Sequence, residues 1–209
     1  IFFNQNPTSA DVNTIMRGWS GSVGFFLLIF VSIITIRLIA EEQRTGTMEL
    51  LLTSPVRDWE VVLGKFLATF VLLLLTLAFT FFYLILMVAF GGRPDWGPVL
   101  SGYLGLLLIG GVAAAFGILA SSLTQSQAVA AVIGILVCII LWFLGPLFVS
   151  NGPTNSEWWS VALSYASLES HVDSFSRGSP DLKDIVYYLT MIILFLGVTV
   201  QILKMRRGE

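Results

Sequence analysis

Long runs without a charged side chain divide this sequence into segments of membrane-spanning length. No charged residue lies between Arg17 and Arg37, between Lys65 and Arg93, or between Asp184 and Lys204. Residues 96–156 are also uncharged, which is too long for one span and right for two. Because about 20 apolar residues cross a bilayer as a helix, the pattern predicts five spans. They cover approximately 21–39, 63–90, 99–121, 127–149 and 185–204.

These spans are predicted to be helices rather than the strands of a barrel. A bilayer offers backbone groups no hydrogen-bonding partner, so a span must satisfy its own. Strands of a membrane barrel alternate between apolar and polar residues. The runs Val71–Leu75 and Ile135–Leu141 show no alternation. The sequence therefore predicts an all-α integral membrane protein, with residues 1–209 forming one transmembrane domain.

The composition excludes several classes of protein. Hydrophobic residues make up 56% of the chain and charged residues 11%, against about 25% charged in a soluble domain. A net charge of -2 argues against a nucleic-acid partner. Cys138 is the only cysteine and His171 the only histidine, so neither a disulfide framework nor a zinc site is expected. No metal site is predicted.

Basic residues orient the chain in the membrane. The tail contains Lys204, Arg206 and Arg207, which the positive-inside rule places in the cytoplasm. Counting back, segments 40–62 and 122–126 are cytoplasmic, and segments 1–20, 91–98 and 150–184 face outside. The sequence opens Ile1-Phe2-Phe3 without a methionine. We therefore expect a sixth span upstream, which would return the N-terminus to the cytoplasm.

Two of the outer segments are expected to contain structure. Residues 9–19 place apolar side chains at helical spacing, which indicates a short helix on the membrane surface. Segment 150–184 is too long for a simple turn. It contains Trp158, Trp159 and Tyr165, residues suited to the headgroup level. We expect it to be re-entrant, with one or two short helices entering the membrane part-way.

The most informative stretch is 40–65, AEEQRTGTMELLLTSPVRDWEVVLGK. A helix over about 41–53 would place Met48, Leu51 and Leu52 on one face. Ser54-Pro55 would end it, because the residue before proline is pushed out of the helical region. The alternative is a solvated loop with snorkelling charges. Such a loop would leave the apolar block Met48–Leu52 uncovered.

The loop also carries a family resemblance, in Arg37–Glu42, in Thr45–Pro55 and in the pair Gly64-Lys65. Further matching stretches are Pro94–Gly97, Tyr103–Gly105, Ser121–Gln127, Phe175–Gly178 and Tyr187. Together they resemble the permeases of ABC-2-type transporters, and most closely the gliding-motility-associated branch. The resemblance implies a type V exporter-like, six-helix permease of the bacterial plasma (inner) membrane. Five of its spans are visible here and the first is missing.

The resemblance assigns the loop to a partner. In this family the first cytoplasmic loop forms a coupling helix in a groove of a separate ATPase. The implied docking residues are Glu41, Glu42, Arg44, Thr45, Gly46, Thr47, Glu49 and Leu50. A second cytoplasmic contact would involve Ser122, Thr124, Gln125 and Gln127, which could equally form a tight polar turn. No phosphate-binding loop occurs in the chain, so ATP and magnesium are expected on the partner ATPase and no cofactor on this chain.

Two patterns inside the spans have alternative interpretations. A run of small residues from Gly110 to Ser121 lets helices approach closely. We favour packing within one subunit over a dimer seam. Thr69, Thr76, Thr80 and Tyr83 form a polar stripe along one span. They are candidates for lining a translocation path, although threonines often only bond to their own helix.

The sequence therefore predicts the membrane-spanning permease subunit of an ATP-driven exporter, without catalytic residues of its own. Its partners would be ABC ATPase subunits, a second identical or related permease copy and membrane lipid, but no nucleic acid. One alternative is a membrane anchor that recruits an ATPase for mechanical or assembly work without moving a substrate. Another is an energy-independent carrier, which the lack of a charged residue inside the spans disfavours.

Overall fold

The computed structural model describes residues 22–35, 57–90, 95–124, 126–150 and 165–207, and the regular secondary structure in these segments is helical. One helix covers Ser22–Thr35. The others are α3 (Asp58–Ala89), α4 (Trp96–Leu123), α5 (Gln127–Ser150), the 3₁₀ helix η2 (Glu169–His171), α7 (Val172–Ser176) and α8 (Leu182–Arg207). These described segments contain no strand, which confirms the all-α class.

Four of these helices are long and apolar enough to cross a membrane. The spanning stretches are Asp58–Leu86, Trp96–Leu123, Gln127–Leu144 and Leu182–Met205. Each overlaps one of the last four spans expected from the sequence, and α3, α4 and α8 begin a few residues earlier than expected. The Ser22–Thr35 helix lies within the expected span 21–39. The expected surface helix 9–19 and the loop helix 41–53 lie outside the described residues.

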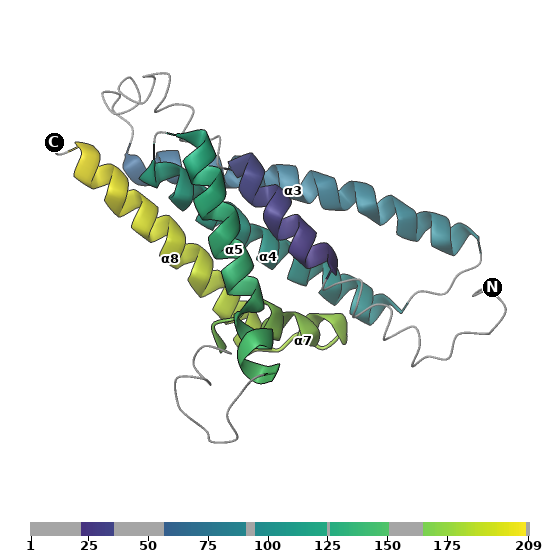
Figure 1. Cartoon of the computed structure of the whole chain (residues 1–209). Coiled ribbons are helices and arrows are strands. Elements are labelled where there is room, and N and C mark those ends of the chain that lie inside the picture. Colours follow the sequence, from purple (N-terminus) through teal and green to yellow (C-terminus); the bar gives the residue numbers. More distant parts are fainter. Residues whose placement is uncertain (1–21, 36–56, 91–94, 125, 151–164, 208–209) are drawn as a thin grey trace.

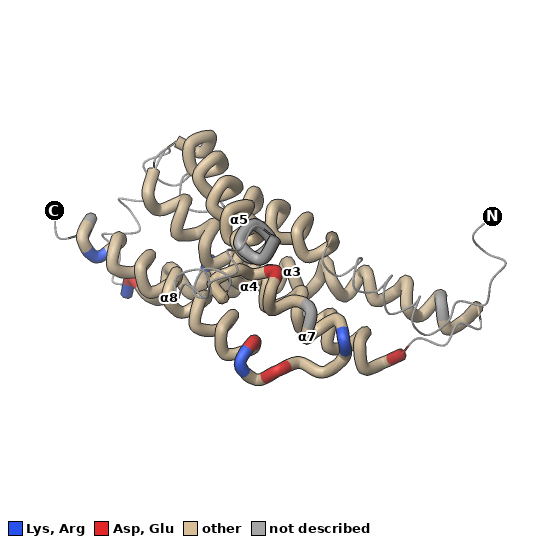
Figure 2. Tube along the Cα trace, turned by 60° about the horizontal axis from the view of Figure 1, so that its bottom comes forward, with Lys and Arg blue, Asp and Glu red and all other residues tan. Residues whose placement is uncertain are grey.

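The spanning helices form a splayed bundle whose ends can be followed in Figure 1. The start of α3, the end of α4, the start of α5 and the C-terminus lie at one end. The short helix α7 and the start of α8 lie at the other end. Charged residues are concentrated toward these two ends, and the helix middles carry none (Figure 2). This separation is what a bilayer requires, because a charge at its centre is costly.

Helix α4 is the centre of the bundle. In its apolar window 83% of residues are buried, against 22% or less in the other three spans. Small residues make this possible. A β-carbon on Gly110 would meet Leu73 of α3 at 2.5 Å, and one on Gly111 would meet Ile192 of α8 at 2.9 Å. These small residues therefore bring together helices of one chain, which agrees with the favoured interpretation of packing within one subunit.

The Ser22–Thr35 helix makes a similarly close approach to α4 at Gly117, where a β-carbon would lie 1.9 Å from the hydroxyl oxygen of Thr35. One turn earlier on the same helix, the Ser32 hydroxyl lies 3.2 Å from the sulfur of Cys138 in α5. Both Ser32 and Cys138 are buried. Polar contacts between helices are useful in a membrane, where water cannot satisfy the groups instead.

Candidate functional site

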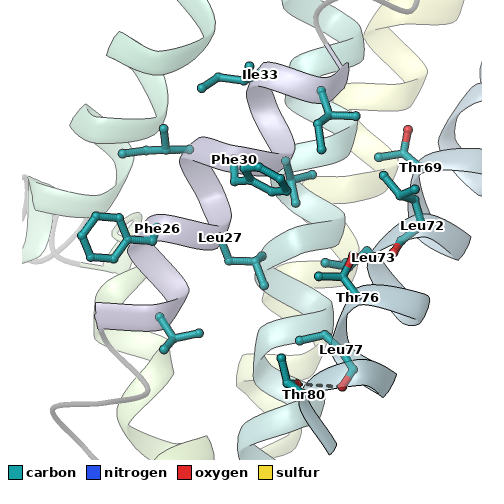
Figure 3. A pocket seen from close by; sticks show the side chains of 14 residues that line it. Phe26, Leu27, Phe30, Ile33, Thr69, Leu72, Leu73, Thr76, Leu77 and Thr80 are labelled. Atoms are coloured by element: carbon teal, nitrogen blue, oxygen red, sulfur yellow. Dashed lines mark hydrogen bonds between the residues drawn. The ribbon is translucent and has the colours of Figure 1, made fainter.

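A cavity of about 550 Å³ lies between the Ser22–Thr35 helix and α3. Figure 3 shows large apolar side chains, among them Leu27, Phe30 and Leu72, directed into it from the two helices. Its lining comprises Val23, Phe26, Leu27, Ile29, Phe30, Val31, Ile33, Ile34, Thr69, Leu72, Leu73, Thr76, Leu77 and Thr80. Three of the four residues of the polar stripe expected from the sequence thus line one cavity.

The three threonines leave the cavity wall almost wholly apolar. The hydroxyl of Thr69 donates to the carbonyl of Lys65 at 3.1 Å, and that of Thr76 to Leu72 at 2.9 Å. Thr80 donates to Leu77 at 2.7 Å (Figure 3). Because each hydroxyl hydrogen is used on its own helix, the wall offers little to a charged solute. The cavity suits hydrocarbon.

The fourth stripe residue does not line the cavity. Tyr83 is 72% exposed on α3 and is absent from the lining. One turn earlier, Thr80 also lies 3.0 Å from the hydroxyl of Tyr103 in α4. This contact ties α3 to the central helix at one end of the cavity. The structure therefore brings Thr69, Thr76 and Thr80 together and leaves Tyr83 apart from them.

The segment proposed as a second cytoplasmic contact is a short polar connection between α4 and α5. Ser122 is fully buried, and its hydroxyl donates to the carbonyl of Leu119 at 2.7 Å. The oxygen of Thr124 accepts from the backbone N–H of Ser126 at 3.1 Å. Gln127 is half-buried at the start of α5, and Gln125 lies outside the described residues. Ser122 and Thr124 thus have the local contacts of a polar turn.

The eight residues implied as the ATPase docking site lie outside the described part of the chain. They are Glu41, Glu42, Arg44, Thr45, Gly46, Thr47, Glu49 and Leu50. The described helix that follows them in the sequence is α3, which begins at Asp58. At this start, the carboxylate of Glu60 accepts the backbone N–H of Arg57 at 3.1 Å. This contact satisfies a donor at the helix start.

A buried polar cluster joins η2 and α7 to α8. The ring nitrogen Nδ1 of His171 lies 2.7 Å from Oδ1 of Asp184, and Nε2 lies 2.9 Å from the carbonyl oxygen of Tyr165. The hydroxyl of Ser174 donates to the second carboxylate oxygen of Asp184. From the sequence, His171 was considered as a ligand of a zinc site and as a member of a Ser/His/Asp arrangement, neither of which was expected, and this pairing was missed. The one indication of this pairing in the sequence was that His171 and Asp184 both lie in the segment 150–184, next to a span.

This cluster contains a serine, a histidine and an aspartate, but not in an arrangement that activates a nucleophile. A catalytic histidine must accept the serine proton. Here Ser174 bonds to Asp184, and both nitrogens of His171 are already occupied. Among the described residues there is also no group of three side chains that could hold a metal ion. Nearby, partial burial raises the pKa of the Glu169 carboxyl.

Comparison with protein families now identifies the chain. The model of the ABC-2 family transporter proteins matches residues 5–205, nearly the whole sequence. The chain belongs to the ABC-2 transporter family. A search of curated proteins finds no match.

Membership of the ABC-2 family confirms the permease expected from the sequence. The chain is a multi-pass membrane protein and the membrane component of an ABC transporter, a class that works with an ABC ATPase. Members of this family are generally non-catalytic. The gliding-motility-associated branch stays a prediction, because the match is to the family as a whole.

Proposed function

We propose that this ABC-2 permease exports an apolar or amphipathic substrate, driven by a separate ATPase that docks on the first loop. Two permease copies, identical or related, would work with two ATPase chains. ATP binding would close the ATPase pair, and the helix at 41–53 would transmit that movement to α3. The observation that carries the proposal is the family match over residues 5–205.

The cavity supports the part of the proposal that concerns the substrate path. It has hydrocarbon walls and lies between two neighbouring spans, the Ser22–Thr35 helix and α3. Helix α3 also follows directly after the proposed coupling segment in the sequence. A movement of that segment would therefore act first on a wall of the cavity. This connection favours transport over an anchor that only recruits an ATPase.

The orientation follows from the bundle and the basic tail. The start of α3, the α4–α5 connection and the C-terminus lie at one end (Figure 1). Lys204, Arg206 and Arg207 are at this end, and the positive-inside rule favours the cytoplasm for it. The proposed docking loop and the α4–α5 connection would then face the ATPase together, at the inner membrane surface.

Docking is tested by co-purifying the full chain with candidate ABC ATPase chains. We expect the double variant Glu42→Arg, Glu49→Arg to lose the ATPase. The matched control is Asp181→Arg, a charge reversal at an exposed carboxylate. Asp181 directly precedes α8, and the start of α8 lies at the other end of the bundle (Figure 1). Integrity of each variant is checked on Cys138, which is buried and stays unlabelled in the folded protein. A double variant that holds the ATPase as the control does would show that the docking residues are wrong.

The path is tested by cysteine labelling with a membrane-impermeant thiol reagent in a Cys138→Ala background. Thr76→Cys places a thiol on the cavity wall. Thr190→Cys is the matched control, because Thr190 is also an exposed threonine bonded to its own helix, in α8 and away from the cavity. Thiol labelling requires the thiolate and therefore water. We expect labelling of the Thr76→Cys variant only, changing with ATP. Equal labelling of both variants, or of neither, would favour the anchor.

A further inference from the structure

His171 and Asp184 are both polar, and both side chains are almost fully buried. The two side chains are 5% and 4% exposed. Tyr187 stacks on the imidazole with ring centroids 4.1 Å apart, and Tyr165 meets its edge at 4.9 Å. A buried charged or polar pair is costly unless every donor and acceptor is matched. The hydrogen bonds of this cluster therefore determine which protons it must hold.

A single proton is shared between the two residues. The carbonyl oxygen of Tyr165 can only accept, so the Nε2 atom of His171 must carry a hydrogen. On the other side, Nδ1 and the carboxylate oxygen of Asp184 are 2.7 Å apart, a hydrogen-bond length. One proton must lie between these two atoms, whichever of them it is bonded to. Without it, a nitrogen lone pair would face a carboxylate oxygen, and the buried cluster would carry an unpaired negative charge.

This shared proton links η2 to α8, two segments that are joined in the chain by α7 and a tight turn. Gly178, at a φ of 82°, reverses the chain between α7 and α8. The hydroxyl of Tyr188 in α8 donates to the carbonyl of Leu168 at 2.8 Å, and that of Tyr187 donates to Ala166 at 2.6 Å. Of these three contacts, the His171–Asp184 bond is the one made between an imidazole and a carboxyl group.

The same segment packs on the other spans. The hydroxyl of Ser101 in α4 donates to the carbonyl of Phe175, and the phenyl ring of Phe175 lies against Gly105. The backbone N–H of Leu168 donates to the carbonyl of Leu141 in α5 at 3.0 Å. Residues 165–178, which we call the end segment, therefore contact α4, α5 and α8 at one end of the bundle (Figure 1).

Few other ionisable groups act on the pair. Tyr165, Tyr187 and Tyr188 surround the imidazole, and Lys183 interacts electrostatically with Asp184. Glu169 lies in the same 3₁₀ helix as His171 and is half-buried. Helices α4 and α5 contain no charged residue. Among the interactions that the structure describes, loss of the shared proton would leave a charge whose cationic neighbour is the exposed Lys183.

We propose that His171 and Asp184 form a one-proton clasp, which holds the end segment on α8 and releases it when the shared proton is lost. His171 and Asp184 act as positioning residues, and the release occurs as the pH rises. The clasp does not depend on the direction of transport or on the ATPase. In the orientation proposed above it lies at the outer end of the bundle. It would then make the position of the end segment respond to the pH outside.

The variant Asp184→Asn tests the shared proton without removing the hydrogen bonds of the cluster. Its amide N–H can donate to Nδ1 of a neutral imidazole, and its amide oxygen can accept from Ser174. The cluster keeps its bonds but no longer depends on a removable proton. The matched control is Asp181→Asn, three residues earlier. Asp181 pairs with Lys183 at 3.0 Å on the surface, where the two side chains are 56% and 65% exposed.

The experiment follows hydrogen exchange of the end segment in the full chain in lipid nanodiscs, from about pH 5 to about pH 10. Rates are corrected for intrinsic exchange and compared with those of α4. All samples carry Glu169→Gln, so that this carboxyl does not titrate. We expect the end segment to lose protection at least about tenfold as the pH rises, because an uncompensated buried charge is strongly destabilising. Asp181→Asn should show the same step, and Asp184→Asn none.

A second measurement covers the case in which Asp184→Asn does not fold. Because His171 is the only histidine in the chain, selective ¹⁵N labelling reports on this imidazole alone. The ¹⁵N shift of Nδ1 should change at the same pH as the step in exchange, because this nitrogen loses the shared proton either as a covalent partner or as a hydrogen-bond acceptor. A step in exchange at a different pH from the imidazole change, parallel profiles of wild type and Asp184→Asn, or no step in the wild type would each overturn the clasp.

Discussion

The contact between Gly117 of α4 and the Ser22–Thr35 helix allows a quantitative test of the central position of α4. A β-carbon on Gly117 would lie 1.9 Å from the hydroxyl oxygen and 2.9 Å from the β-carbon of Thr35. The hydroxyl can rotate away, but the β-carbon is fixed to its backbone. Ordinary carbon contacts are about 3.5–4.0 Å, so Gly117→Ala must separate the helices by roughly 0.6–1.1 Å.

The energetic consequence can be isolated with a second glycine of the same helix. Overpacking of this kind costs about 1–3 kcal/mol. Replacing glycine by alanine in a helix also gains up to about 1 kcal/mol of helix propensity. Gly102 of α4 has no other atom within 4 Å of an added β-carbon, so Gly102→Ala should show the gain alone. The difference in unfolding free energy between the two variants is therefore expected to be roughly 1–3 kcal/mol.

The assay is equilibrium unfolding of the purified chain in mixed detergent micelles with increasing SDS, followed by tryptophan fluorescence. The double variant Gly117→Ala, Thr35→Gly removes the side chain that the new methyl group meets. It should recover part of the lost free energy, as expected for residues in contact. If the unfolding free energies of Gly117→Ala and Gly102→Ala agree to within about 0.5 kcal/mol, the helices do not cross closely at Gly117.

Three further predictions concern the end of the bundle opposite the C-terminus. Gly178→Ala should lower the unfolding free energy by about 1–2 kcal/mol. Gly178 has a φ of 82°, and an added β-carbon would lie 2.8 Å from the backbone nitrogen of Pro98. An unchanged midpoint of thermal unfolding in detergent would contradict this. Tyr188→Phe should lower the unfolding free energy by about 1–3 kcal/mol in the same assay, since the buried carbonyl of Leu168 loses its hydrogen-bond donor. Tyr188→Leu also removes the aromatic ring and should lower the unfolding free energy further. Partial burial raises the pKa of Glu169, so the folded state binds this proton more tightly than the unfolded state. The stability that this proton contributes is lost as the pH rises through the raised pKa, and the unfolding midpoint should fall over that range. Glu169→Gln should remove this fall, and an unchanged pH dependence would refute the prediction.

The candidate site was predictable from the sequence only in part. The stripe Thr69, Thr76 and Thr80 follows from helical spacing, and the structure places all three on one cavity. The second wall of that cavity, with Phe26 and Phe30, was not predictable, because nothing in the sequence states which spans are neighbours. The spacing also included Tyr83, which lies apart from the cavity on α3.

The end segment shows a similar limit. The sequence predicted short helices between the last two spans, and η2 and α7 are short helices there. Apart from their common position in the segment 150–184, nothing in it indicated that His171 would meet Asp184, because the chain reverses at Gly178 between them and no helical or strand periodicity continues through such a turn. The pairing depends on the positive φ of that glycine and on the aromatic residues that exclude water from the cluster.

The sequence by itself determined that the chain is a bundle of membrane helices, since a bilayer leaves an uncharged apolar run of about 20 residues little alternative to a helix. The tertiary structure decided which helix is central. In water the most apolar helix is buried most, but lipid is as apolar as the side chains, so burial in a membrane protein follows close packing instead. Helix α4 occupies the centre because Gly110, Gly111 and Gly117 admit three neighbours at short distance. That property depends on where the neighbours are, and only the folded structure contains it.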